Sequence, residues 1–168
     1  MRHYIEVEHE KCSGCKSCEM VCSLVHFDEC NPAKSAIRVV RKEVNGTAYC
    51  IPLVCQQCEE ALCIDSCPTG AIIRDTAKGI VSIDKESCIL CGDCVNACPV
   101  SSLFMLPGSV EVIKCDLCGG QPQCVDICHV NCILDKTDDD MSGTKGTQRM
   151  VSILDREGFN EYIYWKEA

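Results

Sequence analysis

Short runs of β-branched residues separated by turn residues are the main pattern along this chain. Residues 37–44 are rich in valine and charged residues, as an exposed strand pair would require. Asn45 and Gly46 follow as a pair that accepts positive φ, and residues 48–51 can return as the partner strand. The pattern predicts a β-hairpin over residues 37–51.

The other predicted elements are shorter. Apolar runs predict strands at residues 80–83, 110–113 and 151–154, and residues 69–73 predict a turn that leads into a strand. One or two helical turns are expected after each C-x2-C-x2-C start. Residues 136–149 are polar and rich in Gly, Ser, Thr and Asp, which predicts a surface loop. We expect its acidic triplet to be solvated rather than a docking patch.

Cysteine changes this picture, because 19 of the 168 residues are cysteine. A content this high predicts either a disulfide scaffold or a metal scaffold. Disulfide scaffolds are typical of small secreted proteins, whereas the first ten residues lack a basic start, an apolar run and a cleavage site. The odd number also prevents complete pairing. We therefore expect a metal scaffold in a reducing compartment, most simply the cytoplasm.

The remaining composition argues against several partners. Aromatic residues make up only 5% of the chain, too few for an ordinary apolar core, so inorganic clusters could fill that volume. The formal net charge of −9 argues against nucleic acid and an anionic membrane surface. No run of eighteen apolar residues occurs, so we expect no membrane span.

The cysteines form an internal repeat of four groups. Group one is Cys12, Cys15, Cys18 and Cys22; group two is Cys55, Cys58, Cys63 and Cys67; group three is Cys88, Cys91, Cys94 and Cys98; group four is Cys115, Cys118, Cys124 and Cys128. Pro68 and Pro99 directly follow the last cysteines of groups two and three.

This spacing is typical of [4Fe–4S] cubanes. In the run C-x2-C-x2-C-x3-C-P, three thiolates hold one cluster and the fourth ligates another. Group three matches this run in full, and group one matches it without the proline. A structural zinc site needs two separated C-x2-C pairs, and catalytic thiols come in ones and twos, so both alternatives fit poorly. We expect four [4Fe–4S] clusters as cofactors.

Three stretches resemble a known family. Residues 12–26 look like the first motif of the four-cluster iron–sulfur subunits of molybdenum and tungsten (pterin) oxidoreductases. Residues 54–72 resemble the second motif and residues 114–124 the fourth, so the resemblance covers roughly residues 11–132. Examples of the family are the small subunits of aldehyde oxidoreductase, formate dehydrogenase and tungsten-dependent benzoyl-CoA reductase.

The resemblance implies a crossed pairing of the groups, in which the last cysteine of each group serves another group's cluster. The implied ligand sets are Cys12, Cys15, Cys18 and Cys128 for cluster 1; Cys22, Cys115, Cys118 and Cys124 for cluster 2; Cys55, Cys58, Cys63 and Cys98 for cluster 3; and Cys67, Cys88, Cys91 and Cys94 for cluster 4.

The chain departs from the family's pattern around Cys128. His129 follows this cysteine in place of proline, and Cys132, four residues after Cys128, could replace it as the ligand. A three-cluster protein is the alternative at this site. The spacing between Cys118 and Cys124 is short, as in the small soluble members, which argues against a membrane quinol oxidase as partner.

The predicted fold class is α+β, with two ferredoxin-like two-cluster modules built from short strands, short helices and many loops. We expect a single polyferredoxin unit over residues 1–168. Its parts are module A at 1–32 and 108–135, module B at 50–107, a surface loop at 136–150, and a C-terminal strand and tail at 151–168.

Four residues outside the ligand sets have simpler expected roles. We expect Cys30 and Cys50 to be small buried hydrophobic residues. His26 and His129 lie nearest to the ligands in sequence, and either could donate an N–H to a cluster sulfur. A structural role is the interpretation that we favour for both.

No Walker loop, nucleophile elbow, dinucleotide fingerprint or radical-initiating C-x3-C-x2-C occurs, so we expect no catalytic site on this chain. The resemblance implies an electron-transfer subunit that serves a large tungsten- or molybdenum-pterin catalytic subunit of aldehyde-oxidoreductase or benzoyl-CoA-reductase type. A further electron-donor or acceptor subunit could complete the complex. The alternatives are a free-standing polyferredoxin carrier and a cluster assembly factor.

The C-terminal segment gathers half of the aromatic residues of the chain. These are Phe159, Tyr162, Tyr164 and Trp165. Exposed aromatic clusters are common at interfaces, so we expect this segment to contact the catalytic subunit. The alternative is that the tail folds back over its own clusters.

Overall fold

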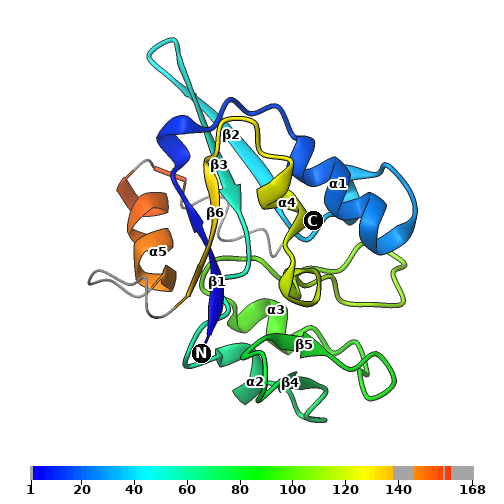
Figure 1. Ribbon diagram of the computed structural model, residues 1–168. Coiled ribbons are helices and arrows are strands. Elements are labelled where there is room, and N and C mark those ends of the chain that lie inside the picture. The colour runs from blue at the N-terminus through cyan, green and yellow to red at the C-terminus, as the bar shows by residue number, and fades with distance from the viewer. Residues whose placement is uncertain (1, 138–145, 157, 160–168) are drawn as a thin grey trace.

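The computed structural model describes residues 2–137, 146–156, 158 and 159 (Figure 1). The strands are β1 (His3–Val7), β2 (Arg38–Val44), β3 (Thr47–Leu53), β4 (Ile72–Arg74), β5 (Val81–Ile83) and β6 (Ile133–Thr137). The α-helices are α1 (Ser17–Phe27), α2 (Leu62–Asp65), α3 (Asp93–Ala97), α4 (Gln123–Asp126) and α5 (Gly146–Arg156). Single 3₁₀ turns are η1 (His9–Lys11), η2 (Pro32–Lys34) and η3 (Leu117–Gly120). The mixed composition of short helices and strands agrees with the α+β prediction.

The predicted hairpin is confirmed. β2 pairs with β3 in antiparallel register from Arg38 opposite Leu53 to Val44 opposite Thr47. Asn45 and Gly46 connect the strands with φ values of 53° and 78°, the left-handed pair that a tight two-residue turn requires. Figure 1 shows this hairpin projecting from one end of the molecule.

The N-terminal strand lies beside the segment that follows group four. β1 and β6 pair antiparallel, with His3 opposite Thr137 and Val7 opposite Ile133. Helix α1, which begins within group one, packs against α4, which begins within group four. These contacts bring groups one and four together in the upper part of Figure 1, although about a hundred residues separate them in sequence.

Groups two and three lie together in the other half of the molecule. β4 pairs with β5, with Ile72 opposite Ile83, and α2 packs against α3. The strand predicted at 80–83 and the turn and strand predicted at 69–73 are thereby confirmed, and Gly70 supplies the turn with φ 67°. Helices are present at the C-x2-C-x2-C starts of groups one and three, as predicted, but α1 in group one has 11 residues and is longer than the expected one or two turns.

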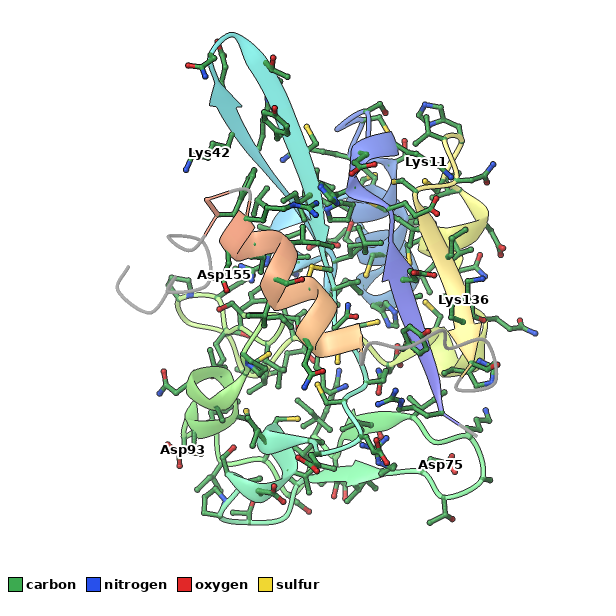
Figure 2. All side chains as sticks on the ribbon, turned by 90° about the vertical axis from the view of Figure 1, so that its left-hand side faces the viewer. Lys11, Lys42, Asp75, Asp93, Lys136 and Asp155 are labelled. Atoms are coloured by element: carbon green, nitrogen blue, oxygen red, sulfur yellow. The ribbon has the colours of Figure 1, made fainter. Side chains whose placement is uncertain are left out.

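Two strand predictions are wrong. Residues 110–113 make only one isolated bridge, between Phe104 and Ile113. Residues 151–154 lie inside helix α5, whose buried positions are Met150, Ile153 and Leu154. This spacing of three and four residues places all three side chains on one helical face. Figure 2 shows α5, with Asp155 near its end, to the left of β1, against which it packs.

Helix α5 ends in a Schellman motif. The N–H of Phe159 donates to the carbonyl of Leu154 at 2.7 Å, and the N–H of Gly158 donates to Asp155 at 3.2 Å, with Gly158 at φ 68°. Phe159 is completely buried. Its predicted role in an exposed aromatic cluster is therefore wrong, because the helix cap turns it into the chain's own core. The other three aromatics of that cluster lie outside the described residues.

The prediction of a surface loop over residues 136–150 is wrong at both of its ends. Lys136 and Thr137 complete β6, and residues 146–150 belong to α5, because both segments pair or pack against β1. The middle of the predicted loop, including the acidic triplet, lies outside the described residues. Among the helices in the described ranges, none has the length and apolar character needed to cross a membrane.

Candidate iron–sulfur cluster sites

The four cysteine loops share one backbone feature. The residue immediately before the second cysteine has positive φ in every group: Gly14 at 70°, Gln57 at 46°, Leu90 at 59° and Leu117 at 56°. Non-glycine residues rarely adopt this conformation, and those that do are concentrated at functional sites. A left-handed residue in such a turn aims successive backbone N–H groups at an anion. The loops are therefore shaped to surround a thiolate-bound, negatively charged group.

Eight of the predicted ligands lie in two cavities of the lower half. Cys55, Cys58, Cys63 and Cys98 line one cavity, the set predicted for cluster 3. Cys67, Cys88, Cys91 and Cys94 line a second cavity, the set predicted for cluster 4. Each set draws its thiols from both group two and group three. The fold thus brings these thiols together in the crossed combination that the resemblance implies.

A third cavity contains the thiols predicted for cluster 1 together with Cys132. Its cysteines are Cys12, Cys15, Cys18, Cys128 and Cys132. The Sγ atoms of Cys128 and Cys132 are 3.5 Å apart, and the N–H of Cys132 donates to the Cys128 sulfur at 3.3 Å. A hydrogen bond with Cys132 lowers the pKa of Cys12 to about 6, which outweighs the opposing effect of burial. Both candidate fourth ligands therefore face the same site.

The thiols predicted for cluster 2 lie close enough to influence one another. Burial raises the pKa of Cys124, and the neighbouring Cys22 and Cys118 thiols raise it further. Burial likewise raises the pKa of Cys115, to which Cys124 also contributes. The N–H of Ala36 donates to the Cys22 sulfur at 3.3 Å.

Two histidines approach predicted ligands at opposite sides of this half. His26 Nε2 lies 3.5 Å from Cys118 Sγ and 3.5 Å from an Asp116 carboxylate oxygen. His129 Nδ1 lies 3.8 Å from Cys15 Sγ. Each ring nitrogen is placed where an N–H could reach a ligand sulfur, as the sequence positions of the two histidines had indicated.

The donor atoms fit iron–sulfur clusters. Three cavities each collect at least four cysteine sulfur atoms, the donor type that cubanes use. Burial raises the pKa of both Cys18 and Cys63 to about 12, so these thiols keep their protons in the chain without metal. Metal binding releases these protons, because the thiolate is the ligand. Cluster assembly is therefore expected to supply much of the free energy that keeps these thiols buried together.

Lys114 and Gln57 join the two halves, and no sequence signal singled them out. Lys114 Nζ donates to the carbonyls of Val81 and Cys115 at 2.5 and 2.9 Å. The buried Gln57 amide also donates to the Cys115 carbonyl, at 2.9 Å, and accepts from the Val81 N–H at 2.8 Å. Burial alone would lower the pKa of Lys114, but nearby thiols, Cys55 foremost, raise it above its ordinary value. A cation therefore lies between ligands predicted for clusters 2 and 3.

The two cysteines expected to be small buried hydrophobic residues differ from each other: Cys50 is partly buried against the core, and Cys30 is not buried. Cys30 is exposed, so its predicted burial is wrong: it follows the end of α1 in a surface connection to η2. Cys50 is half-buried in β3 and packs against the loop of group one. A Cβ atom placed on Gly14 would lie 2.6 Å from the Cys50 sulfur.

This close approach predicts that Gly14→Ala disrupts cluster 1. The methyl group would meet the Cys50 sulfur at a distance that forces the Cys50 side chain or one of the two backbones to shift, and the left-handed backbone adds about 1–2 kcal/mol of strain. We expect anaerobic iron analysis to show a loss of about four irons per chain. Gly46→Ala is the matched control, because Gly46 has φ 78° and nothing within 4 Å. Full iron content in Gly14→Ala would contradict the prediction, and Cys50→Ala added to it is expected to restore part of the loss.

Comparisons with known proteins agree with this chemistry. Residues 47–139 match the family model of a 4Fe-4S dicluster domain, and residues 9–25 match that of a 4Fe-4S binding domain. The polyferredoxin-like subunit of the aliphatic sulfonate oxidoreductase of Pyrococcus furiosus is 42% identical over 130 residues, which cover 76% of this chain and 72% of the relative. The thiosulfate reductase electron transfer subunit PhsB of Salmonella typhi is 32% identical and covers 77% of this chain and 73% of its own length.

A chain in the active site complex BamBC of benzoyl coenzyme A reductase, in complex with benzoyl-CoA, is 27% identical to this one. The match covers 96% of both chains with a TM-score of 0.48. From the family models and the curated relatives, this chain belongs to the 4Fe-4S dicluster family of ferredoxin-type electron-transfer subunits and binds multiple [4Fe–4S] clusters.

Proposed function

We propose that the chain holds four [4Fe–4S] clusters in the four crossed ligand sets, as two modules of two clusters each. Module A combines groups one and four, and module B combines groups two and three. The convergence of Cys98 with the thiols of group two, and of Cys67 with those of group three, is the observation that carries this proposal. The pairing of β1 with β6 and of β4 with β5 supports the module boundaries.

Three of the four sites follow one another through the molecule. Cys18 of cluster 1 lies close enough to Cys124 of cluster 2 to contribute to its raised pKa, behind burial and two nearer thiols. Cys55 of cluster 3 likewise contributes, after burial, to the raised pKa of Cys115 of cluster 2. Cubane clusters, when bound, accept and release electrons. The chain would thus supply a conducting path through clusters 1, 2 and 3, and cluster 4 would share module B with cluster 3.

Lys114 has a defined task in this arrangement. Its ammonium group lies between thiols predicted for clusters 2 and 3, the junction of the two modules. A positive charge in a partly buried site stabilises added negative charge nearby more strongly than it would in water. The side chain would therefore favour the reduced state on either side of the junction while it binds the two segments together.

The partner is proposed to be a large tungsten- or molybdenum-pterin catalytic subunit of aldehyde-oxidoreductase or benzoyl-CoA-reductase type. Support comes from the motifs at residues 12–26, 54–72 and 114–124, which resemble the small subunits of such enzymes. Two relatives bear the names of subunits: one of an aliphatic sulfonate oxidoreductase and one of a thiosulfate reductase. The free-standing carrier remains the second candidate, since the relative HydN of Escherichia coli K12 is named an electron transport protein.

Anaerobic purification of the native chain from its own cells tests this proposal. We expect a large chain to co-purify in a fixed ratio and to contain tungsten or molybdenum with a pterin. A chain that purifies alone with all of its iron would contradict the subunit proposal and favour the carrier. A large partner that lacks its metal would favour the assembly factor.

A further inference from the structure

The residue four positions after the last cysteine varies between three of the groups. It is Ala71 after Cys67, Ser102 after Cys98 and Cys132 after Cys128. All three side chains are nearly completely buried, at 1%, 2% and 2% exposure. Because the groups are repeats of one another, these residues occupy one equivalent position in three copies of the same turn.

At this position the backbone makes the same contact each time. The N–H of Ser102 donates to the Cys98 sulfur at 3.4 Å, and the N–H of Cys132 donates to the Cys128 sulfur at 3.3 Å. The backbone N–H of Ala71 also reaches the Cys67 sulfur. This shared contact makes Cys128 the equivalent of Cys67 and Cys98. Cys132 is then the equivalent of Ser102, a neighbour of the ligand.

The side chains at this position differ in what they add. Ser102 Oγ lies 3.4 Å from Cys98 Sγ, and Cys132 Sγ lies 3.5 Å from Cys128 Sγ, so each can donate a hydrogen to the ligand sulfur. The single S–H of Cys132 is shared between Cys128 and Cys12, and both are ligands predicted for cluster 1. Ala71 has only a methyl group at the edge of the cluster 4 cavity. At this position two of the sites therefore have a side-chain donor, whereas at the third the hydroxyl beside the ligand sulfur comes from Thr69, whose Oγ1 lies 3.7 Å from Cys67 Sγ.

We propose that Ser102 and Cys132 are positioning residues that raise the midpoint potentials of clusters 3 and 1 by hydrogen bonding to Cys98 and Cys128. The inference rests on the proposed ligand sets. Hydrogen bonds to cluster sulfurs are among the factors that set cluster potentials. A donor stabilises the more negative, reduced state more than the oxidised state, because a hydrogen bond to an anionic acceptor strengthens with its charge. Removing the donor then lowers the midpoint potential.

The experiment compares three variants of the cluster-loaded chain by redox titration monitored by electron paramagnetic resonance, with iron counted in each. Ser102→Ala and Cys132→Ala are each expected to lower one midpoint potential while about sixteen irons are kept. Ala71→Ser is the reciprocal variant: it adds a hydroxyl beside Cys67 and is expected to raise a third midpoint. Each variant should shift a different one of the four.

The outcomes separate this inference from the proposed function. Unchanged midpoints with full iron content would overturn the inference and leave the four ligand sets intact. Loss of about four irons in Cys132→Ala would overturn it differently, by making Cys132 a ligand. Two variants that shift the same midpoint would contradict the ligand sets themselves, and with them the proposed arrangement of clusters.

Discussion

Cys67→Ser is expected to disturb the cluster held by group three, although Cys67 belongs to group two in sequence. The reason is the shared cavity of Cys67 with Cys88, Cys91 and Cys94, whereas the other thiols of group two converge with Cys98. Serine oxygen is a poor substitute for thiolate at iron, so we expect a loss of up to about four irons per chain.

Double variants identify which cluster is lost. Cys67→Ser combined with Cys91→Ser should remove no more iron than either change alone, because both residues serve cluster 4. Cys67→Ser combined with Cys58→Ser should remove about eight irons, because two clusters are affected. Cys30→Ser is the control, since Cys30 is exposed and outside the ligand sets. If instead Cys67→Ser with Cys58→Ser removed no more iron than either change alone, and Cys67→Ser with Cys91→Ser removed about eight irons, group two would hold its own cluster. The crossed arrangement would then be wrong.

Cys128→Ala is expected to abolish cluster 1, and Cys132→Ala is expected to leave it in place. Both thiols face the site, but Cys128 occupies the position of Cys98 in the repeat and receives the backbone N–H of Cys132. Iron content should therefore fall by about four in the first variant and stay near sixteen in the second. Retention of iron in Cys128→Ala, with loss only when both residues are changed, would show that Cys132 is a competent ligand and would contradict the assignment.

Local chemistry explains which parts of the fold could be predicted. The β2–β3 hairpin depends on Asn45 and Gly46, whose turn conformation is decided within a few residues. Helix α5 was missed because residues 151–154, taken alone, show no helical period; it emerges only when Met150 is included with Ile153 and Leu154. The burial of Phe159 depends on a helix cap that could not be expected where a strand had been predicted.

At the cluster sites, too, the sequence predicts what is decided locally and misses what depends on contacts between distant residues. The C-x2-C spacing predicts ligands because three thiolates must come from one loop, a local requirement. Which group supplies the fourth thiolate is decided by tertiary structure, so it came from the family resemblance. The approach of Cys50 to Gly14 and the place of Lys114 between two sites join residues that are distant in sequence. No spacing rule signals such contacts, and only the folded chain reveals them.

Anaerobic determination of iron and acid-labile sulfide on the native chain tests the central claim most directly. Four complete sets of four thiols predict about sixteen of each per chain. About twelve of each would contradict the four-cluster arrangement and would indicate that the site of Cys128 and Cys132 is empty.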